Sequence, residues 1–436
     1  MGGYIPSTED ERRQMLDALG LPNAAALYAD VPETMRFPAL DLPAGKSELE
    51  TARALRALAE KNTVFSCICR GAGAYDHYIP AVVQSAVSDA SFLTAYTPYQ
   101  AEISQGVLQS IFEYQTMICE LTGMDVSNAS VYDGATAAAE AVAMCRDRKR
   151  NAVYVSAGVH PMTLETVRTY CAGAGAPVRL LPLTDGVTDV SAVAALPEDA
   201  ACVLVQQPNY YGLYEDAAAL FAAAHAAGAK GVLSVNPIAA AVLQSANDCG
   251  ADVAVGDGQP LGMPLAFGGP YLGFMASTAA MMRKLPGRIV GETEDVDGKR
   301  AFVLTLQARE QHIRREKAGS NICSNQALCA LTASAYMAAM GPDGMRDVAM
   351  QCTSKAHYLA DALARCGLPR RYPGAFFHEF LTECPVNTDR VLNALSEKGV
   401  LGGLPVENGL LWCVTEKVEK AQLDEIIDTV RKAVGA

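Results

Sequence analysis

Tyrosine and amide side chains gather in one stretch of the chain, where their types and spacing suggest a polar binding pocket. Tyr96, Tyr99 and Gln100 flank a proline within residues 94–106, just before a pattern typical of a helix. A tyrosine ring joins an apolar body to a polar tip, and loops often carry such groups toward a ligand. A surface or interface loop without chemistry explains the same residues equally well.

A second candidate for chemistry is the start of an alanine-rich helical stretch at residues 132–137. The free backbone N–H groups of a helix start attract anions such as phosphate. Asp133 stands at this helix start and already carries a negative charge. Aspartate is a preferred N-cap residue, so we expect Asp133 to cap the helix and any phosphate to compete with it.

Positive charge concentrates in residues 307–326 of an otherwise acidic chain. The basic residues there are Arg309, Arg314, Arg315 and Lys317. Such a cluster can bind a carboxylate or another anionic partner. We favour instead a helix in which these residues form ion pairs with Glu310 and Glu316.

Motifs for other common chemistries are missing from the sequence. Residues 71–73 read Gly-Ala-Gly, but the third glycine of a dinucleotide-binding loop does not follow. The sequence contains neither a nucleophile elbow nor a phosphate-cradling loop. Cys67 and Cys69 form the only close pair of cysteines, and their spacing fits no common zinc or redox motif. We therefore predict neither a metal site nor a disulfide.

The composition excludes two classes of partner. With 35 lysines and arginines against 48 aspartates and glutamates, the net charge of -13 repels nucleic acid and anionic lipid. No apolar run approaches the roughly 20 residues that a membrane span needs. The first residues contain no export signal, and 13 cysteines lie scattered along the chain. We expect a cytoplasmic protein that binds neither nucleic acid nor membranes.

Short apolar runs alternate with helical segments through the middle of the chain, which predicts an α/β fold. Helical patterns cover residues 106–121 and 135–146. The strand-like runs are residues 152–155, 178–182, 202–205, 231–235 and 252–255. Short strands between helices indicate a mostly parallel, doubly wound sheet with helices on both faces.

The two ends of the chain differ from this middle part, so we predict three domains. Residues 1–61 form an N-terminal helical arm, and residues 62–325 form the large doubly wound domain. Residues 326–436 form a smaller C-terminal domain. The arm begins with a capping-box pattern, Ser7 with Asp10 or Thr8 with Glu11. A long helix near residues 324–340 ends at the turn signal Gly-Pro-Asp-Gly.

Four long stretches together resemble the alpha subunits of bacterial two-subunit glycine decarboxylases, the P-proteins of the glycine cleavage system. These stretches begin YIPSTEDE, TAYTPYQAEISQG, VGDGQPLG and QAREQHIRREK. The resemblance implies a fold-type-I, aspartate-aminotransferase-like fold of the pyridoxal-phosphate-dependent transferases. It also implies glycine as substrate, a beta subunit in an alpha2-beta2 assembly, and lipoylated H-protein as the acceptor of the aminomethyl group.

The resemblance further implies where the cofactor is bound. A His-Lys pair of the catalytic subunit corresponds to Gln259-Pro260 here, and proline has no amine for a Schiff base. Asn236 stands where an aspartate would hold the cofactor ring nitrogen protonated. We expect the beta subunit to bind pyridoxal 5'-phosphate covalently, and this chain to be non-catalytic. Its remnant pocket would include Asp133, Thr136, His160 and Gln259. Alternatively, His160 is a loop histidine whose ring nitrogens are hydrogen-bonded within the chain.

The resemblance also implies that this chain lines its partner's active site, because fold-type-I sites commonly lie between subunits. The candidates are Tyr96, Pro98, Tyr99, Gln100, Ser104 and Gln105. Two alternative functions stay open. The chain could be a self-sufficient pyridoxal-phosphate lyase or decarboxylase that uses Lys284 or Lys317, or a purely structural subunit that docks H-protein.

Overall fold

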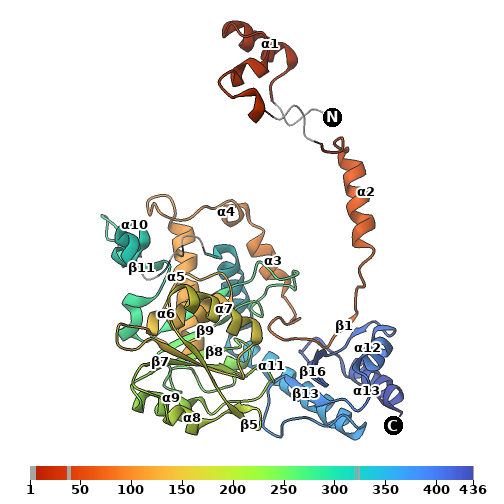
Figure 1. Cartoon of the computed structure of the whole chain (residues 1–436). Helices are drawn as coiled ribbons and strands as arrows, with labels where there is room; N and C mark the ends of the chain where they lie inside the picture. The colour runs from red at the N-terminus through yellow and green to blue at the C-terminus, as the bar shows by residue number, and fades with distance from the viewer. Residues whose placement is uncertain (1–5, 37–40, 319, 321, 323–324, 436) are drawn as a thin grey trace. The chain divides into compact units, whose positions relative to one another are not determined.

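The computed structural model describes residues 6–36, 41–318, 320, 322 and 325–435 (Figure 1). Contacts divide the chain into two compact units, Met1–Thr63 and Val64–Ala436. This division, between Thr63 and Val64, falls close to the predicted end of the N-terminal arm at residue 61. The predicted boundary between residues 325 and 326 lies inside the second unit and stays a prediction.

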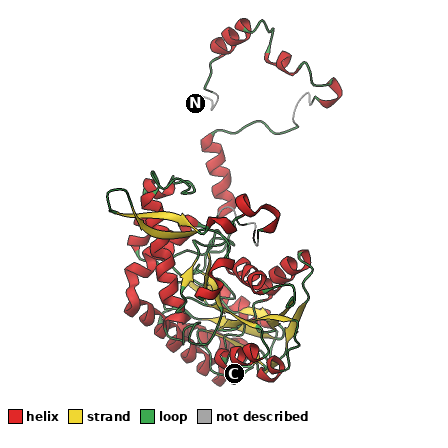
Figure 2. Cartoon of the chain, turned by 90° about the vertical axis from the view of Figure 1, so that its left-hand side faces the viewer, coloured by secondary structure: helices red, strands yellow, loops and turns green. Residues whose placement is uncertain are grey.

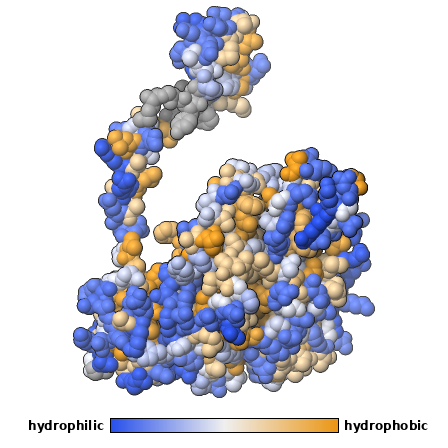
Figure 3. Space-filling model, turned by 180° about the vertical axis from the view of Figure 1, so that it is seen from behind, coloured by the Kyte–Doolittle hydropathy of each residue, from blue (hydrophilic) through white to orange (hydrophobic). Residues whose placement is uncertain are grey.

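The N-terminal unit carries two helices that bury none of their described residues. Helix α1 (Glu9–Ala18) begins at Thr8, whose hydroxyl accepts a hydrogen bond from the Glu11 backbone N–H at 3.2 Å. The Glu11 carboxylate accepts one from the Thr8 backbone in return, which confirms the second of the two predicted capping boxes. Helix α2 (Glu48–Ala59) starts with the same arrangement. Its leucines stay exposed, and apolar patches show on this unit in Figure 3.

A seven-stranded sheet forms the centre of the second unit, in the order β2-β10-β9-β8-β7-β3-β4. Strands β9, β8, β7, β3 and β4 run parallel, whereas β10 is antiparallel to both of its neighbours. The predicted, mostly parallel sheet is therefore confirmed. Its strands are β2 (Val126–Ser127), β3 (Ala152–Ser156), β4 (Val178–Leu181), β7 (Ala200–Gln207), β8 (Lys230–Val235), β9 (Val253–Asp257) and β10 (Gly273–Ser277).

Alternating side chains of the strands build two cores, one on each face of the sheet. In β7, Cys202 and Leu204 join one core with residues of α6 (Gly134–Cys145) and α7 (Pro161–Gly173). Val203 and Val205 join the other core with residues of α5 (Gln105–Thr122), α9 (Ala217–Ala226) and α11 (Ala327–Arg365). Neighbouring residues of a strand point to opposite faces, so an entirely apolar strand requires cover on both sides. Figure 2 shows helices on both sides of the strands.

Element α11 consists of two helices joined by a kink at Gly341, where φ is 62° and the backbone is not helical. The first helix therefore ends near Met340, where the Gly-Pro-Asp-Gly signal predicts a break. The second helix follows at once and continues to Arg365. Pro342 lies at the start of the helical part after the kink, where its missing N–H would have no partner anyway. Glycine supplies the left-handed conformation that joins the two parts.

A third core lies in the C-terminal part of the second unit, around the antiparallel strands β13 (Glu379–Glu383), β16 (Gly409–Cys413) and β15 (Leu404–Val406). Trp412 is fully buried there and donates a hydrogen bond from Nε1 to the Thr382 hydroxyl at 3.0 Å. The elements that complete this part are α12 (Thr388–Ser396), α13 (Lys420–Val434), and the pair β1 (Cys67–Ile68) and β14 (Val400–Leu401).

A β-hairpin packs against α5 through apolar side chains and two hydrogen bonds. It consists of β11 (Ile289–Glu294) and β12 (Arg300–Thr305). The Gln115 amide donates to the Val290 carbonyl at 2.9 Å and accepts from the Val290 N–H at 3.0 Å. Shorter elements of this unit are α3 (Ala81–Val87), α4 (Ala90–Leu93), β5 (Leu183–Thr184), β6 (Val187–Thr188), α8 (Val190–Ala194), η3 (Ala239–Ala241) and η4 (Ala279–Lys284). In the N-terminal unit the short elements are η1 (Ala24–Tyr28) and η2 (Glu33–Met35).

The basic segment after β12 does not form the predicted ion-paired helix. It is broken into η5 (Gln307–Arg309), α10 (Gln311–Arg314) and η6 (Arg315–Lys317), and Arg315 has a φ of 53°. Within the described part of this segment, the one ion pair joins His312 to Glu310 at 3.7 Å. Helical ion pairs need a continuous helix to bring residues four apart together, so the broken helix removes them. The side chain of Arg309 lies outside the described residues.

No described helix is both long enough and apolar enough to cross a lipid bilayer.

We predict that Leu204→Ala lowers the free energy of unfolding by about 2–5 kcal/mol, because it leaves a cavity in a core that relaxes only partly. Leu204 is fully buried in the central strand β7. The measurement is urea unfolding of the purified chain, followed by circular dichroism. Leu180→Ala in the edge strand β4 is the matched control, because Leu180 is 47% exposed and should lose well under half as much. Equal losses in the two variants would contradict the arrangement of cores.

Candidate functional site

A cavity of about 430 Å³ opens at the carboxyl ends of the parallel strands β7, β8 and β9. Open α/β sheets bind their ligands at this edge. Its lining includes Asp133, His160, Asn236, Asp257 and Pro260, which lie far apart in the sequence. Of the four residues expected to form the remnant pocket, two line this cavity, Asp133 and His160. Thr136 and Gln259 are not part of the lining.

Two carboxylates occupy the helix start that borders the cavity. Asp133 caps α6, because its Oδ1 accepts a hydrogen bond from the Thr136 N–H at 2.7 Å, which confirms the predicted N-cap. Asp257 Oδ2 accepts a further bond from the Gly134 N–H at 3.0 Å. A methyl group at Gly134 would meet the Asp257 backbone at 2.7 Å, so the helix start and the end of β9 are in close contact.

The electrostatics of this helix start oppose a second anion. Burial raises the pKa of Asp257 to about 6, and the neighbouring Asp133 also raises it, whereas hydrogen bonds from the Gly134 and Gln259 N–H groups lower it. The two carboxylates accept hydrogen bonds from the Gly134 and Thr136 N–H groups, which are donors that a phosphate would use. A phosphate at this helix start would therefore have to compete with them.

Pro260 and Asn236 line the cavity without supplying a reactive group. No described residue of its lining is a lysine. The Asn236 Oδ1 accepts hydrogen bonds from the N–H groups of Ile238 and Ala239, at 2.9 and 3.1 Å, so it caps the turn η3. Its Nδ2 is buried and has no partner among the described residues. Lys284 and Lys317 are both exposed and lie outside this lining.

Gln259 holds the neighbouring loop to the sheet. Its Oε1 accepts a hydrogen bond from the Tyr75 N–H at 2.8 Å, and its Nε2 donates to the Tyr75 carbonyl at 2.9 Å. The side chain is fully buried and also donates to the Met263 carbonyl at 2.8 Å. The Gln259 oxygen and both N–H groups of its amide are therefore hydrogen-bonded within the chain, which assigns Gln259 a structural role.

His160 lies at the edge of the cavity with both ring nitrogens hydrogen-bonded within the chain. Its Nδ1 accepts a bond from the Met162 N–H at 3.1 Å, so Nε2 carries the proton and donates to the Ala72 carbonyl at 2.9 Å. Burial lowers the pKa of His160, which keeps the ring neutral. The ring also meets the Tyr210 ring edge-on at 5.2 Å. His160 borders the cavity but has no nitrogen free for a ligand.

The sequence analysis missed an acid at the wall of the cavity. Glu379 is buried, and its two oxygens accept hydrogen bonds from the Ala72 N–H at 2.6 Å and the Tyr75 hydroxyl at 2.8 Å. Burial raises the pKa of Glu379 to about 7. His378 lies beside it, also buried, with neither ring nitrogen bonded to a described residue. The signal in the sequence was weak, a glutamate next to the apolar residues Phe380 and Leu381.

Tyr96, Tyr99 and Gln100 are exposed on one irregular segment, which we call the tyrosine loop and define as residues 94–104. Tyr96 is 84% exposed and Tyr99 is 54% exposed. Pro98 is buried, and Ser104 stands at the start of α5 without a side-chain cap. Both amide atoms of Gln105 bond to the Phe302 backbone, at 2.8 and 2.9 Å. The loop therefore offers Tyr96, Tyr99 and Gln100 to a partner, while Pro98 and Gln105 support it.

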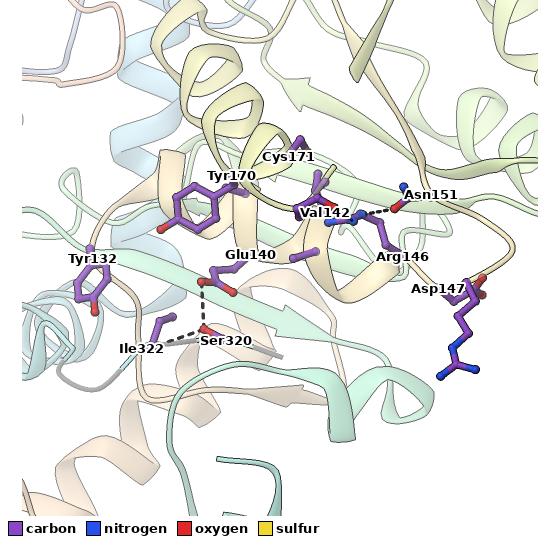
Figure 4. A pocket seen from close by; sticks show the side chains of 14 residues that line it. Tyr132, Glu140, Val142, Arg146, Asp147, Asn151, Tyr170, Cys171, Ser320 and Ile322 are labelled. Atoms are coloured by element: carbon purple, nitrogen blue, oxygen red, sulfur yellow. Dashed lines mark hydrogen bonds between the residues drawn. The ribbon is translucent and has the colours of Figure 1, made fainter. Parts of the chain in front are cut away.

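A second cavity, of about 690 Å³, lies against α6 and α7 (Figure 4). Glu140 accepts a hydrogen bond there from the Ser320 hydroxyl at 3.0 Å, and burial raises its pKa. Arg146 donates to the Asn151 side chain at 2.8 Å. Burial also raises the pKa of the Cys171 thiol, which keeps it protonated. None of these groups is a nucleophile at neutral pH.

We predict that Glu379→Gln gains stability relative to the natural chain as pH rises from 4.5 to 7. The folded chain holds a proton on Glu379 up to about pH 7, against a usual pKa of 4.5, so ionisation destabilises the fold across this window. Thermal unfolding of both proteins at each pH measures the difference. Glu383→Gln on the same strand is the control, because Arg371 lowers the pKa of Glu383. A constant difference for Glu379→Gln would contradict the raised pKa.

Comparison with known proteins identifies the family. Residues 2–430 match the family described as glycine cleavage system P-protein. A relative from Moorella thermoacetica, named probable glycine dehydrogenase (decarboxylating) subunit 1, is 48% identical over 98% of this chain and 99% of its own length. A relative of the same name from Prosthecochloris aestuarii is also 48% identical, over 98% of this chain and 99% of its own length.

Solved structures agree with the sequence matches. The crystal structure of glycine decarboxylase (P-protein) of the glycine cleavage system, in inhibitor-bound form, has a TM-score of 0.93 at 44% identity and covers 99% of this chain and 100% of that chain. Aspartate aminotransferase from Thermus thermophilus, at 16% identity and a TM-score of 0.59, covers 85% of this chain and 99% of that chain. The latter likeness shows the fold alone and confirms the predicted fold-type-I class. The chain belongs to the glycine cleavage system P-protein family.

Proposed function

We propose that this chain is the non-catalytic alpha subunit of a glycine decarboxylase, completed by a beta subunit. The family match and the relatives named glycine dehydrogenase (decarboxylating) subunit 1 support this function. In the proposed reaction glycine loses its carboxylate as carbon dioxide, and its aminomethyl group bonds to one sulfur of the lipoyl disulfide of H-protein. The other sulfur is reduced to a thiol, which balances the step.

The observation that carries the proposal is a cavity at the expected place that lacks the groups for pyridoxal phosphate. The family implies this cofactor, but the residues present do not fit it. Pro260 offers no amine, Asn236 offers no negative charge, and the carboxylates of Asp133 and Asp257 occupy the helix start. We infer that the beta subunit supplies the Schiff-base lysine and holds the cofactor.

The tyrosine loop is the part of this chain that we propose reaches the partner's active site. Its two tyrosines and Gln100 are exposed and supported from behind by buried residues. Apolar rings with polar tips can exclude water and orient a small polar substrate at the same time. We further propose an alpha2-beta2 assembly that receives lipoylated H-protein, in the cytoplasm.

We predict that the chain purified alone shows no absorption band of bound pyridoxal phosphate, and that borohydride fixes no cofactor to it. Purified with its beta subunit, the complex should show the band and exchange carbon dioxide with glycine when lipoylated H-protein is present. The measurements are absorbance and peptide mass mapping after reduction. Cofactor fixed to Lys284 or Lys317 would overturn the proposal in favour of a self-sufficient enzyme.

We predict that Gln100→Ala lowers glycine-dependent carbon dioxide exchange of the complex by about tenfold or more, a loss typical of one polar contact to a charged group. The control is Gln109→Ala, because the exposed Gln109 amide bonds only to Glu113 in its own helix. Gel filtration should show that both variants still assemble.

The same pair of variants distinguishes a subunit that shares the active site from one that only docks H-protein. If the chain only docks H-protein, the Gln100→Ala and Gln109→Ala complexes should have the same turnover at saturating H-protein. That result would sink the proposed contribution of the tyrosine loop.

A further inference from the structure

Arg288 is a buried cation whose charge no described residue balances. Only 6% of the residue is exposed. Its Nη2 donates a hydrogen bond to the Tyr99 hydroxyl at 2.6 Å, and its guanidinium carbon lies 4.8 Å from the centre of the Tyr99 ring. Its Nε is buried without an acceptor, and within the described ranges Arg288 forms no ion pair.

Two other arginines of the second unit with low exposure have charged or multiple hydrogen-bond acceptors. Arg371 forms ion pairs with Glu383 and Glu407. Arg70 donates to the carbonyl groups of Gly402 and Gly403, at 3.1 and 3.0 Å. Among the described residues, the hydrogen-bond acceptor of Arg288 is one neutral hydroxyl, that of Tyr99. The contrast shows that this fold usually satisfies its partly buried guanidinium groups.

Burial of an incompletely paired guanidinium is unfavourable. A charge taken out of water loses its hydration, and only a close counter-charge with full hydrogen bonding restores that loss. The Tyr99 ring and hydroxyl offset part of it through a cation–π contact and one hydrogen bond. An anion bound to the guanidinium would compensate for the rest of the lost hydration free energy.

The backbone at Arg288 is anchored on both sides. Its carbonyl accepts a hydrogen bond from the Ala129 N–H at 2.8 Å. The next residues, Ile289 and Val290, are buried in the hairpin that Gln115 bonds to α5. The guanidinium itself is oriented by its hydrogen bond and ring contact with Tyr99, and an oriented guanidinium suits recognition of a planar oxyanion.

The Tyr99 side of the pair connects it to the tyrosine loop. Tyr99 is 54% exposed, so the hydroxyl that binds Arg288 belongs to a ring that also faces outward. An anion that approaches this loop from another chain meets the guanidinium beside the ring. Arg288 is not among the residues that line the cavity described above, so this is a separate place in the fold.

We propose that Arg288, positioned by Tyr99, binds an oxyanion in the active site of the assembled enzyme. The inference rests on the proposed sharing of the partner's site. The oxyanion is the carboxylate of glycine or the phosphate of the cofactor, both of which offer the paired oxygens that a guanidinium binds.

The test compares the natural complex with Arg288→Gln and Arg288→Lys complexes. Dissociation constants for glycine and for methylamine, which lacks the carboxylate, are measured from the cofactor's spectral change. Affinities of cofactor-free complexes for pyridoxal phosphate and for pyridoxal are measured in parallel. Arg300→Gln is the matched control, because Arg300 also lies over an aromatic ring, that of Phe302, but is exposed and paired with Glu292.

A glycine carboxylate at Arg288 predicts that Arg288→Gln weakens glycine binding by about tenfold to a hundredfold while methylamine binding stays unchanged. A cofactor phosphate predicts the same loss for pyridoxal phosphate while pyridoxal binding stays unchanged. In either case Arg288→Lys should recover part of the loss, because it keeps the charge but not the fork. Arg300→Gln should match the natural complex.

Two results would overturn the proposal. In the first, all four affinities of Arg288→Gln equal those of the control. In the second, subunit association weakens while the four affinities in the assembled fraction stay unchanged, which would mean that Arg288 pairs with a carboxylate of the partner's surface. Failure of the proposed function itself is recognised separately, because the natural chain would then bind cofactor alone or Gln100→Ala would leave turnover intact.

Discussion

The N-terminus of α6 is the point on which the character of the cavity depends. Two carboxylates, from Asp133 and Asp257, accept the N–H groups of Thr136 and Gly134 there. A helix start has only a few free N–H groups, and each can be satisfied by a side chain or by a ligand. Two of them are satisfied within this chain. Without these carboxylates, the two N–H groups would need another partner, such as a ligand or water.

Polar side chains also connect the large sheet to the C-terminal strands, which have separate hydrophobic cores. Gln259, next to the end of β9, bonds to both backbone groups of Tyr75, and the Tyr75 hydroxyl bonds to Glu379 on β13. One loop residue thus joins the large sheet to the small one. A fully satisfied buried network of this kind fixes geometry more strictly than apolar contacts do. This network therefore fixes the part of the cavity wall that contains Tyr75 and Glu379.

Sequence reasoning was most successful where a pattern is local and repeated. The strands around Leu204 and Val232 were predictable, because uninterrupted apolar runs of that length need cover on two faces. The Asp133 cap was predictable from residue type alone. The break in α11 was predictable from Gly341 and Pro342, but the second helix after it was not, because both residues are compatible with a turn as well as with a kink. Arg288 was out of reach for another reason. Its importance comes from its burial and from the lack of an ion pair with any described residue, and both are properties of the folded chain.

Trp412 has a consequence for how the molecule can be observed. It is the single tryptophan of the sequence, and it is enclosed in the C-terminal core with its indole N–H bonded to Thr382. Indole emission depends on local polarity, so tryptophan fluorescence of this chain reports on that core. Loosening of the seven-stranded sheet or of the arm would leave the emission maximum of Trp412 where it is. Tryptophan fluorescence of this protein therefore describes one of its hydrophobic cores, and vibrational or far-ultraviolet spectra are needed for the others.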